Sequence, residues 1–200
     1  MRSRASCYTP RMLYTGKGDG GTTKTFGCDQ QRISKASELP EALGTLDELN
    51  SFLGLAKVRA ASGFDPKVPV GARKRATSSV IADIQQTLFI VQAEIAGAPK
   101  RVGKAKVAQA ELIINTLEAL MPPITTFTVA GGTELSATLD VARTLARRTE
   151  RRVIAVYELG LRKESPNTKA YLNRLSSLLF ALARFANEDA GIPRETPQYK

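Results

Sequence analysis

Apolar residues recur every three or four positions in five long segments of this chain, and no other feature constrains its fold as strongly. The segments cover about 38–60, 77–96, 104–120, 134–159 and 166–189, and glycines and prolines separate them. Only Thr125–Ala130 reads as extended chain. Five long amphipathic helices with short connections predict an all-α fold, a five-helix antiparallel bundle.

Two helix starts are marked by their residue types. Thr133 follows a pair of glycines and is a favoured N-cap, and Glu134 suits the positive end of the helix dipole. Ser165 followed by Pro166 predicts the start of the last helix.

Composition indicates one globular domain over 12–189, with tails at 1–11 and 190–200. Hydrophobic residues make up 42% and charged residues 24% of the 200, a mixture typical of folded soluble proteins. No apolar run approaches the roughly 20 residues that span a bilayer, so we expect no membrane segment. Cys7 and Cys28 form no CxxC motif, and the N-terminus has no apolar signal region. A cytoplasmic protein without disulfides is therefore predicted.

The chain contains no histidine, which removes the commonest general base and the imidazole metal ligands. Its net charge is +10, so an anionic partner is expected. The chemistry must therefore come from other side chains, and three groups of residues offer them.

The first segment is the loop 14–27, YTGKGDGGTTKTFG, with five glycines, four threonines and two lysines. Backbone N–H groups, hydroxyls and ammonium groups together suit a polyphosphate. The loop is not a Walker A motif, because Thr22 and Thr23 stand where Lys-Ser/Thr is required. Its GxGxxG spacing lacks the preceding strand of a dinucleotide fold. A flexible, solvated loop is the alternative interpretation.

The second segment holds five arginines within ten residues of the fourth helix. Steps of four place them on two stripes, and arginine forks bind phosphate oxygens. A solvated face or a nucleic-acid surface is the alternative. The stripes are formed by Arg143, Arg147 and Arg151 and by Arg148 and Arg152.

Polar residues beside apolar stripes form the third group of candidates. Asp47 lies beside the leucines of the first helix, where an exposed face is the simpler interpretation. Asn173 lies on a mostly apolar helix and needs hydrogen-bond partners, whether structural or from a ligand. Phe127, before the paired glycines, reads by default as a core residue.

Taken together, these motifs resemble the corrinoid adenosyltransferases of the trimeric, propanediol-utilisation type. The resemblance covers about residues 12–187 and keeps the order of four motifs. They are YTGKGDGGTTKTFG, EALGTLDELNSFLG, FTVAGGTELSATLDVARTLARRTERR and YLNRLSSLLFALAR.

The resemblance implies a five-helix bundle that forms homotrimers with active sites between adjacent subunits. It implies transfer of the 5′-deoxyadenosyl group of ATP, bound with Mg²⁺, to the cobalt of a reduced corrinoid such as cob(I)alamin, with release of triphosphate. A flavoprotein reductase and an adenosylcobalamin-dependent acceptor enzyme are the implied protein partners.

The resemblance also implies roles for individual residues. Asp47 and Arg143 match an ion pair that supports the corrinoid side across the subunit interface, and Phe127 matches an aromatic below the cobalt. Together with Arg147, these three form the expected catalytic set. The expected ATP-binding residues are Thr15, Gly16, Lys17, Gly18, Thr23, Lys24, Lys35, Arg147, Arg148, Glu150, Arg151 and Asn173.

Four positions depart from the family pattern. Gly16 stands where a basic residue is usual, and Ala130 replaces a proline before the paired glycines. Asp140 replaces a histidine three residues before Arg143 and could compete with Asp47 for that arginine. Thr149 replaces an alanine.

Two other functions are weighed against this resemblance. The charge and the basic linkers at 67–75 and 100–106 favour a nucleic-acid-binding bundle, whose binding would depend steeply on salt. Aromatic residues are only 6% and tryptophan is absent, so stacking platforms are scarce, and that function leaves the glycine-threonine loop unexplained. We therefore expect no nucleic-acid partner. Another ATP-dependent transferase on a helical bundle is the third alternative.

Overall fold

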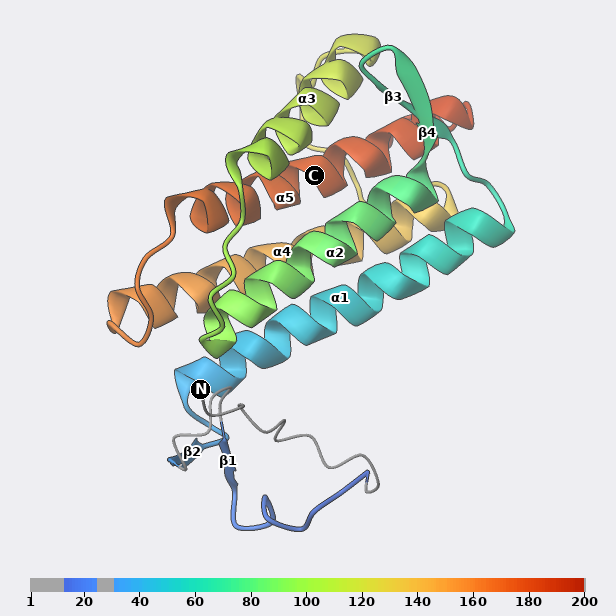
Figure 1. Ribbon diagram of the computed structural model, residues 1–200. Coiled ribbons are helices and arrows are strands. Elements are labelled where there is room, and N and C mark those ends of the chain that lie inside the picture. Colours follow the sequence, from blue (N-terminus) through green and yellow to red (C-terminus); the bar gives the residue numbers. More distant parts are fainter. Residues whose placement is uncertain (1–12, 25–30, 200) are drawn as a thin grey trace.

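The computed structural model describes residues 13–24 and 31–199, and its regular structure is mostly helical (Figure 1). The prediction of five helices is confirmed, with boundaries within two residues of those expected. The helices are α1 (Glu38–Ser62), α2 (Thr77–Ala96), α3 (Lys104–Leu120), α4 (Glu134–Glu158) and α5 (Pro166–Asp189).

The helix α4 is packed between α1 and α5, while α2 packs on α1 and α3 on α5. Ion pairs of Arg59 with Glu134 and of Glu41 with Arg152 join opposite ends of α1 and α4, so these two helices run antiparallel. The apolar stripes meet in one core, where each fully buried leucine contributes about 1.5–3 kcal/mol. Its largest fully buried side chains include Leu46, Leu49, Leu53, Leu88, Leu139, Leu175 and Leu179.

The strands of this structure do not lie in the segment that was predicted to be extended. Residues 125–130 form no strand, and two short antiparallel pairs lie where only loops were expected. One pairs β1 (Thr22–Lys24) with β2 (Arg32–Ser34), and the other pairs β3 (Lys67–Val70) with β4 (Arg73–Ala76) across a turn at Gly71. Strands of three or four residues leave too short a pattern to detect, because their stability comes from pairing.

The two predicted helix starts lie where expected, but only one has a side-chain cap. The Thr133 hydroxyl accepts a hydrogen bond from the Ser136 N–H at 3.1 Å. Ser165 occupies the N-cap position before Pro166, yet its hydroxyl donates to Thr168 Oγ1 at 3.0 Å.

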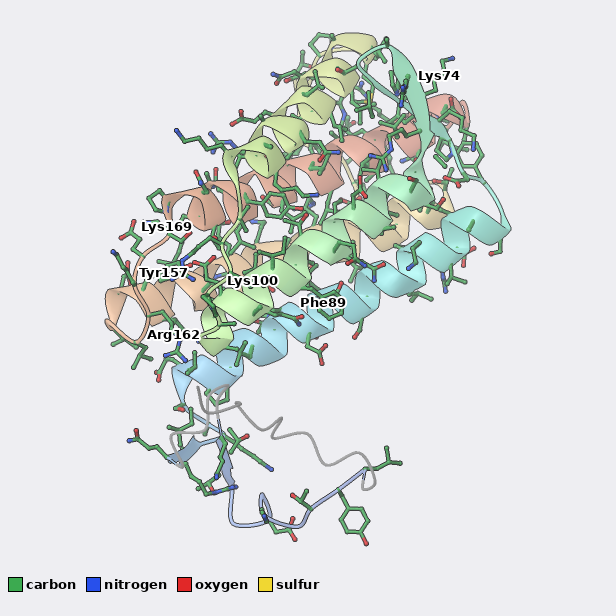
Figure 2. All side chains as sticks on the ribbon, in the orientation of Figure 1. Lys74, Phe89, Lys100, Tyr157, Arg162 and Lys169 are labelled. Atoms are coloured by element: carbon green, nitrogen blue, oxygen red, sulfur yellow. The ribbon has the colours of Figure 1, made fainter. Side chains whose placement is uncertain are left out.

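That bond belongs to a buried polar cluster where the end of α4 meets α2 and α5. Glu94 is 2% exposed, and it accepts hydrogen bonds from Tyr157 Oη at 3.0 Å and Thr168 Oγ1 at 2.7 Å. Burial, followed by the nearby Glu94 charge, raises the pKa of Tyr157, so its hydroxyl remains a donor. Figure 2 shows Tyr157 near Arg162, which donates to the carbonyls of Ile95 and Ala96 at the end of α2.

The described part of the C-terminal tail, residues 190–199, is not a detached end. Its backbone and side chains hydrogen-bond to residues 122–129 between α3 and α4. The other predicted tail, residues 1–11, and both cysteines lie outside the described residues. No helix within residues 13–24 and 31–199 is both long and apolar enough to cross a membrane.

The buried Glu94 cluster predicts the cost of removing one donor. Thr168→Val keeps the side-chain shape but leaves a buried carboxyl oxygen short of a hydrogen bond, so the free energy of unfolding should fall by about 1–3 kcal/mol. Urea unfolding followed by circular dichroism measures this change. Thr116→Val is the matched control, because Thr116 is a half-buried helical threonine outside this cluster whose hydroxyl donates to the Leu112 carbonyl of its own helix, and it should change stability by under about 0.5 kcal/mol. Equal losses in both variants would contradict the assignment.

Candidate active site

The glycine-rich loop is folded onto β2. Gly16 and Gly21 adopt positive φ angles of 67° and 74°, which glycine takes without the steric cost of a side chain. The Asp19 N–H donates to the Gly16 carbonyl at 3.2 Å, and the Lys35 N–H donates to the Gly21 carbonyl at 2.9 Å. Thr15, Lys17 and other loop residues remain exposed around these turns.

Two basic residues from beyond the loop organise it. Arg32 on β2 donates to Thr22 Oγ1 at 2.7 Å and to the Thr22 and Lys17 carbonyls. The Lys35 ammonium lies so close to Gly18 that a Cβ there would come within 2.9 Å of its Nζ. The structure therefore brings Lys35 to the loop, as expected, and adds Arg32, which sequence reasoning missed because its role depends on the pairing of β1 with β2.

The arginines of α4 divide between two faces, as their spacing predicts. Arg148 pairs with Glu48, and Arg152 Nε lies 3.3 Å from Glu41 Oε1, so both face α1. Arg147 is exposed on the other face, and its carbonyl accepts a hydrogen bond from Arg151 at 3.0 Å.

The structure explains why a threonine is accepted at position 149. Thr149 is fully buried, and its hydroxyl donates to the Thr45 carbonyl on α1 at 3.0 Å. This departure from the family pattern therefore adds a contact between α1 and α4 and leaves the neighbouring arginines in place.

Glu150 and Asn173 are brought together from α4 and α5. Asn173 Nδ2 donates to Glu150 Oε1 at 3.1 Å, and Asn173 Oδ1 accepts from Arg174 Nη1 at 2.8 Å. Arg174 also pairs with Glu111 on α3 at 3.1 Å. The asparagine is thus held at the exposed edge between α4 and α5. Its hydrogen-bond partners fix which side of the side chain carries the oxygen and which carries the nitrogen.

Phe127, Arg143 and Arg147 line one pocket of about 390 Å³ over α4 and α5. Residues of α5 and of the segment around Phe127 also line it: Ser176, Ser177, Phe180, Ile124, Thr126 and Thr128. Phe127 is 80% exposed, so its default interpretation as a core residue was wrong. An exposed aromatic ring beside two arginines provides both an apolar surface and positive charge, as a large anionic or amphipathic ligand requires.

Arg143 is held within its own chain by two interactions. Its Nε lies 3.0 Å from Asp140 Oδ1, and its guanidinium lies 5.9 Å from the centre of the Phe180 ring. Asp140 therefore occupies this arginine in the single chain, as the sequence suggested it could. Asp47 is exposed on α1, and its pair with Arg143 across a subunit interface stays a prediction.

The turn before α4 is fixed by Asn187, a residue that sequence reasoning missed. Asn187 Oδ1 accepts from the Thr133 N–H at 2.9 Å, and its Nδ2 donates to the Gly131 carbonyl at 2.8 Å. Gly132 has a φ of 94°, and a Cβ there would lie 2.5 Å from the Asn187 amide. This contact secures the turn although alanine replaces the family proline at position 130.

No cluster of three or more His, Cys, Asp or Glu side chains that could hold a metal is found in residues 13–24 and 31–199. The charged groups of the site are mainly cations, with Glu150 as the nearest carboxylate to Asn173. Cations of this kind beside an apolar surface are able to bind a polyanion.

The family model described as cobalamin adenosyltransferase matches residues 13–186. The corrinoid adenosyltransferase PduO of Citrobacter freundii is 36% identical over 186 residues, which cover 89% of this chain and 50% of that protein. A corrinoid adenosyltransferase of Bacillus subtilis is 34% identical over 186 residues, covering 90% of this chain and 89% of that protein.

A solved structure gives the same result. A variant PduO-type ATP:corrinoid adenosyltransferase from Lactobacillus reuteri, complexed with cobalamin and ATP, is similar with a TM-score of 0.79 and 27% identity over 94% of this chain and 100% of that chain. The resemblance inferred from the four motifs is confirmed. This chain belongs to the cobalamin adenosyltransferase family, and it spans about half the length of the PduO relatives from Citrobacter freundii and Salmonella typhimurium.

The close approach at Gly132 predicts a local loss of stability. Gly132→Ala should lower the free energy of unfolding by about 1–3 kcal/mol. Alanine is strained at the positive φ of this position, and its Cβ would also clash with the Asn187 amide. Gly44→Ala is the control, since a Cβ there has nothing within 4 Å and alanine favours a helix, and it should raise stability slightly. Thermal unfolding of both variants checks the pair, and a neutral Gly132→Ala would show that Asn187 does not fix this turn.

Proposed function

We propose that this chain transfers the 5′-deoxyadenosyl group of ATP to the cobalt of a reduced corrinoid, giving adenosylcobalamin or a related product and releasing triphosphate. Family membership supports the reaction class. The observation that carries the proposal in this molecule is the pocket shared by Phe127, Arg143 and Arg147, where an exposed ring and two cations face the same space.

The residues present are sufficient for this chemistry without a histidine. Co(I) is itself a strong nucleophile, so its attack on the ribose C5′ requires no protein base. The leaving triphosphate gains charge as the C5′–O bond breaks, and arginine, lysine and loop N–H groups can stabilise that charge. In the proposal Mg²⁺ arrives with the triphosphate and is not held by a separate carboxylate cluster.

The ATP site is proposed to form from two elements of an antiparallel bundle. The loop residues Thr15, Gly16, Lys17, Gly18, Thr23, Lys24 and Lys35 would surround the phosphates from one subunit. The α4 and α5 residues Arg147, Arg148, Glu150, Arg151 and Asn173 would bind the nucleotide from the next. The bonds that fold the loop join it to β2 and Lys35 and leave its outer residues exposed, which is consistent with docking against a neighbouring subunit.

On the corrinoid side, Phe127 is proposed to exclude the lower axial ligand of cobalt. A four-coordinate Co(II) is easier to reduce than a five-coordinate one, and reduction is the difficult step at biological potentials. Phe127 is 80% exposed and lines the pocket, so its ring is available for such a contact. Asp47 and Arg143 would support this side across the interface.

The partners follow from the same reaction. We propose a cytoplasmic homotrimer that receives electrons through a flavoprotein reductase and delivers its product to an adenosylcobalamin-dependent enzyme. Light scattering tests the trimer, and a stable, active monomer would contradict it.

The direct test of activity is spectroscopic. The purified chain with ATP, Mg²⁺ and chemically reduced cob(I)alamin should produce the absorption spectrum of adenosylcobalamin. Omission of ATP is the control, and no spectral change with all components present would overturn the proposed function.

The same assay can separate the proposed role of Phe127 in Co(II) reduction from the binding of ATP. Phe127→Ala should lower turnover that starts from Co(II) and a reduced-flavin donor by at least about tenfold, and should leave the KM for ATP unchanged. Phe64→Ala, which removes a 40% exposed phenylalanine after α1, is the matched control and should behave as the unmodified chain. Unchanged Co(II) turnover in Phe127→Ala would remove this assignment.

A shared site between subunits predicts complementation. Lys35→Ala disables the loop and Arg151→Ala disables the α4 face, so each variant alone should be nearly inactive. Trimers reassembled from an equal mixture should recover up to about a quarter of the original activity, because about one interface in four then combines an intact loop with an intact helix. Recovery would be absent if both elements served the same subunit.

A further inference from the structure

The segment between α3 and α4, residues 121–133, contains Phe127 but has no helix or strand to fix its path. After the buried Met121 come Pro122 and Pro123, which have no N–H to donate, so their backbone can form hydrogen bonds only through carbonyl oxygens. An exposed ring on such a segment would move freely unless other parts of the chain held the backbone on both sides of it.

The first anchor is made by two arginines. Arg194 donates from Nη2 to the Pro122 carbonyl at 2.8 Å and from Nη1 to the Pro123 carbonyl at 3.2 Å. Arg184 on α5 donates to the same Pro122 carbonyl at 2.7 Å. The two cations are held close together by this shared carbonyl, and burial, followed by the charge of Arg194, lowers the pKa of Arg184.

The second anchor lies on the other side of Phe127. The Val129 N–H donates to the Glu195 carbonyl at 2.9 Å, one residue beyond Arg194. Phe127 therefore stands between two anchors to which the adjacent residues Arg194 and Glu195 contribute, and Arg184 of α5 adds to the first of them. Its ring is exposed, so these backbone bonds, and not burial of the ring, determine where it lies.

We propose that Arg194 is a positioning residue that acts through Phe127, and this inference rests on the proposed function. Its bidentate bond to the two proline carbonyls holds the 122–129 segment so that the ring faces the pocket lined by Arg143 and Arg147. Arg194 touches neither this pocket nor the α4 arginines, and its effect is confined to the step that requires Phe127.

The test compares turnover that starts from Co(II) with turnover that starts from Co(I). Arg194→Ala should lower turnover from Co(II) with a reduced-flavin donor by at least about tenfold, because it removes two hydrogen bonds from a charged donor. Turnover from chemically prepared Co(I), and the KM for ATP, should remain unchanged. Arg194→Lys keeps the charge but not the paired geometry and should give an intermediate Co(II) rate. Arg73→Ala removes an exposed arginine of β4 and is the matched control.

A double-mutant cycle shows whether Arg194 acts through the ring. Phe127→Ala combined with Arg194→Ala should be no slower from Co(II) than Phe127→Ala alone, because the positioned group is already missing. Additive losses, or an equal loss from Co(I) and Co(II), would overturn this inference alone. Failure of the unmodified chain to form adenosylcobalamin from Co(I) would overturn the proposed function and this inference with it.

Discussion

The packing of α4 between α1 and α5 is the constraint on which the rest of the structure depends. The helices α1 and α5 cover two sides of α4. The arginines of α4 recur every three or four residues, so they must lie along the parts of its surface that these helices leave uncovered. Arg148 and Arg152 meet carboxylates of α1, while Arg143 and Arg147 reach the pocket beside Phe127. Because an α-helix has 3.6 residues per turn, the same helix can place its apolar residues in the core and its arginines on the surface.

The helices could be predicted from the sequence because their information is local. Leu46, Leu49 and Leu53 repeat along one face, and Thr133 caps α4 with its own side chain. The short strand pairs could not be predicted, since the bond of Arg32 to Thr22 joins residues ten apart in a segment without a repeating pattern. The sequence of 125–130 suggested extended chain, but this segment pairs with no neighbouring strand. The Val129 N–H instead bonds to the Glu195 carbonyl, far along the chain.

The candidate site shows the same division. The motifs identified most of its residues, and the structure places Phe127 with Arg143 and Arg147 and joins Glu150 to Asn173. The supporting residues escaped detection, because an arginine or asparagine that holds a distant carbonyl has no signature of its own. Asn187 and Arg194 are of this kind, and both follow the last motif, which ends at Arg184.

The pairing of Arg148 with Glu48 has a consequence for ligand discrimination. A guanidinium already engaged by a carboxylate is not a vacant phosphate receptor, so an incoming anion must outcompete that internal counter-ion. A nucleotide with a long phosphate chain can do so more readily than a monophosphate, because its several charges act together. In the proposed ATP site, the pair of Arg148 with Glu48, whose side chains are 42% and 52% exposed, would lower the affinity for shorter, less charged adenine compounds by about 1 kcal/mol at most.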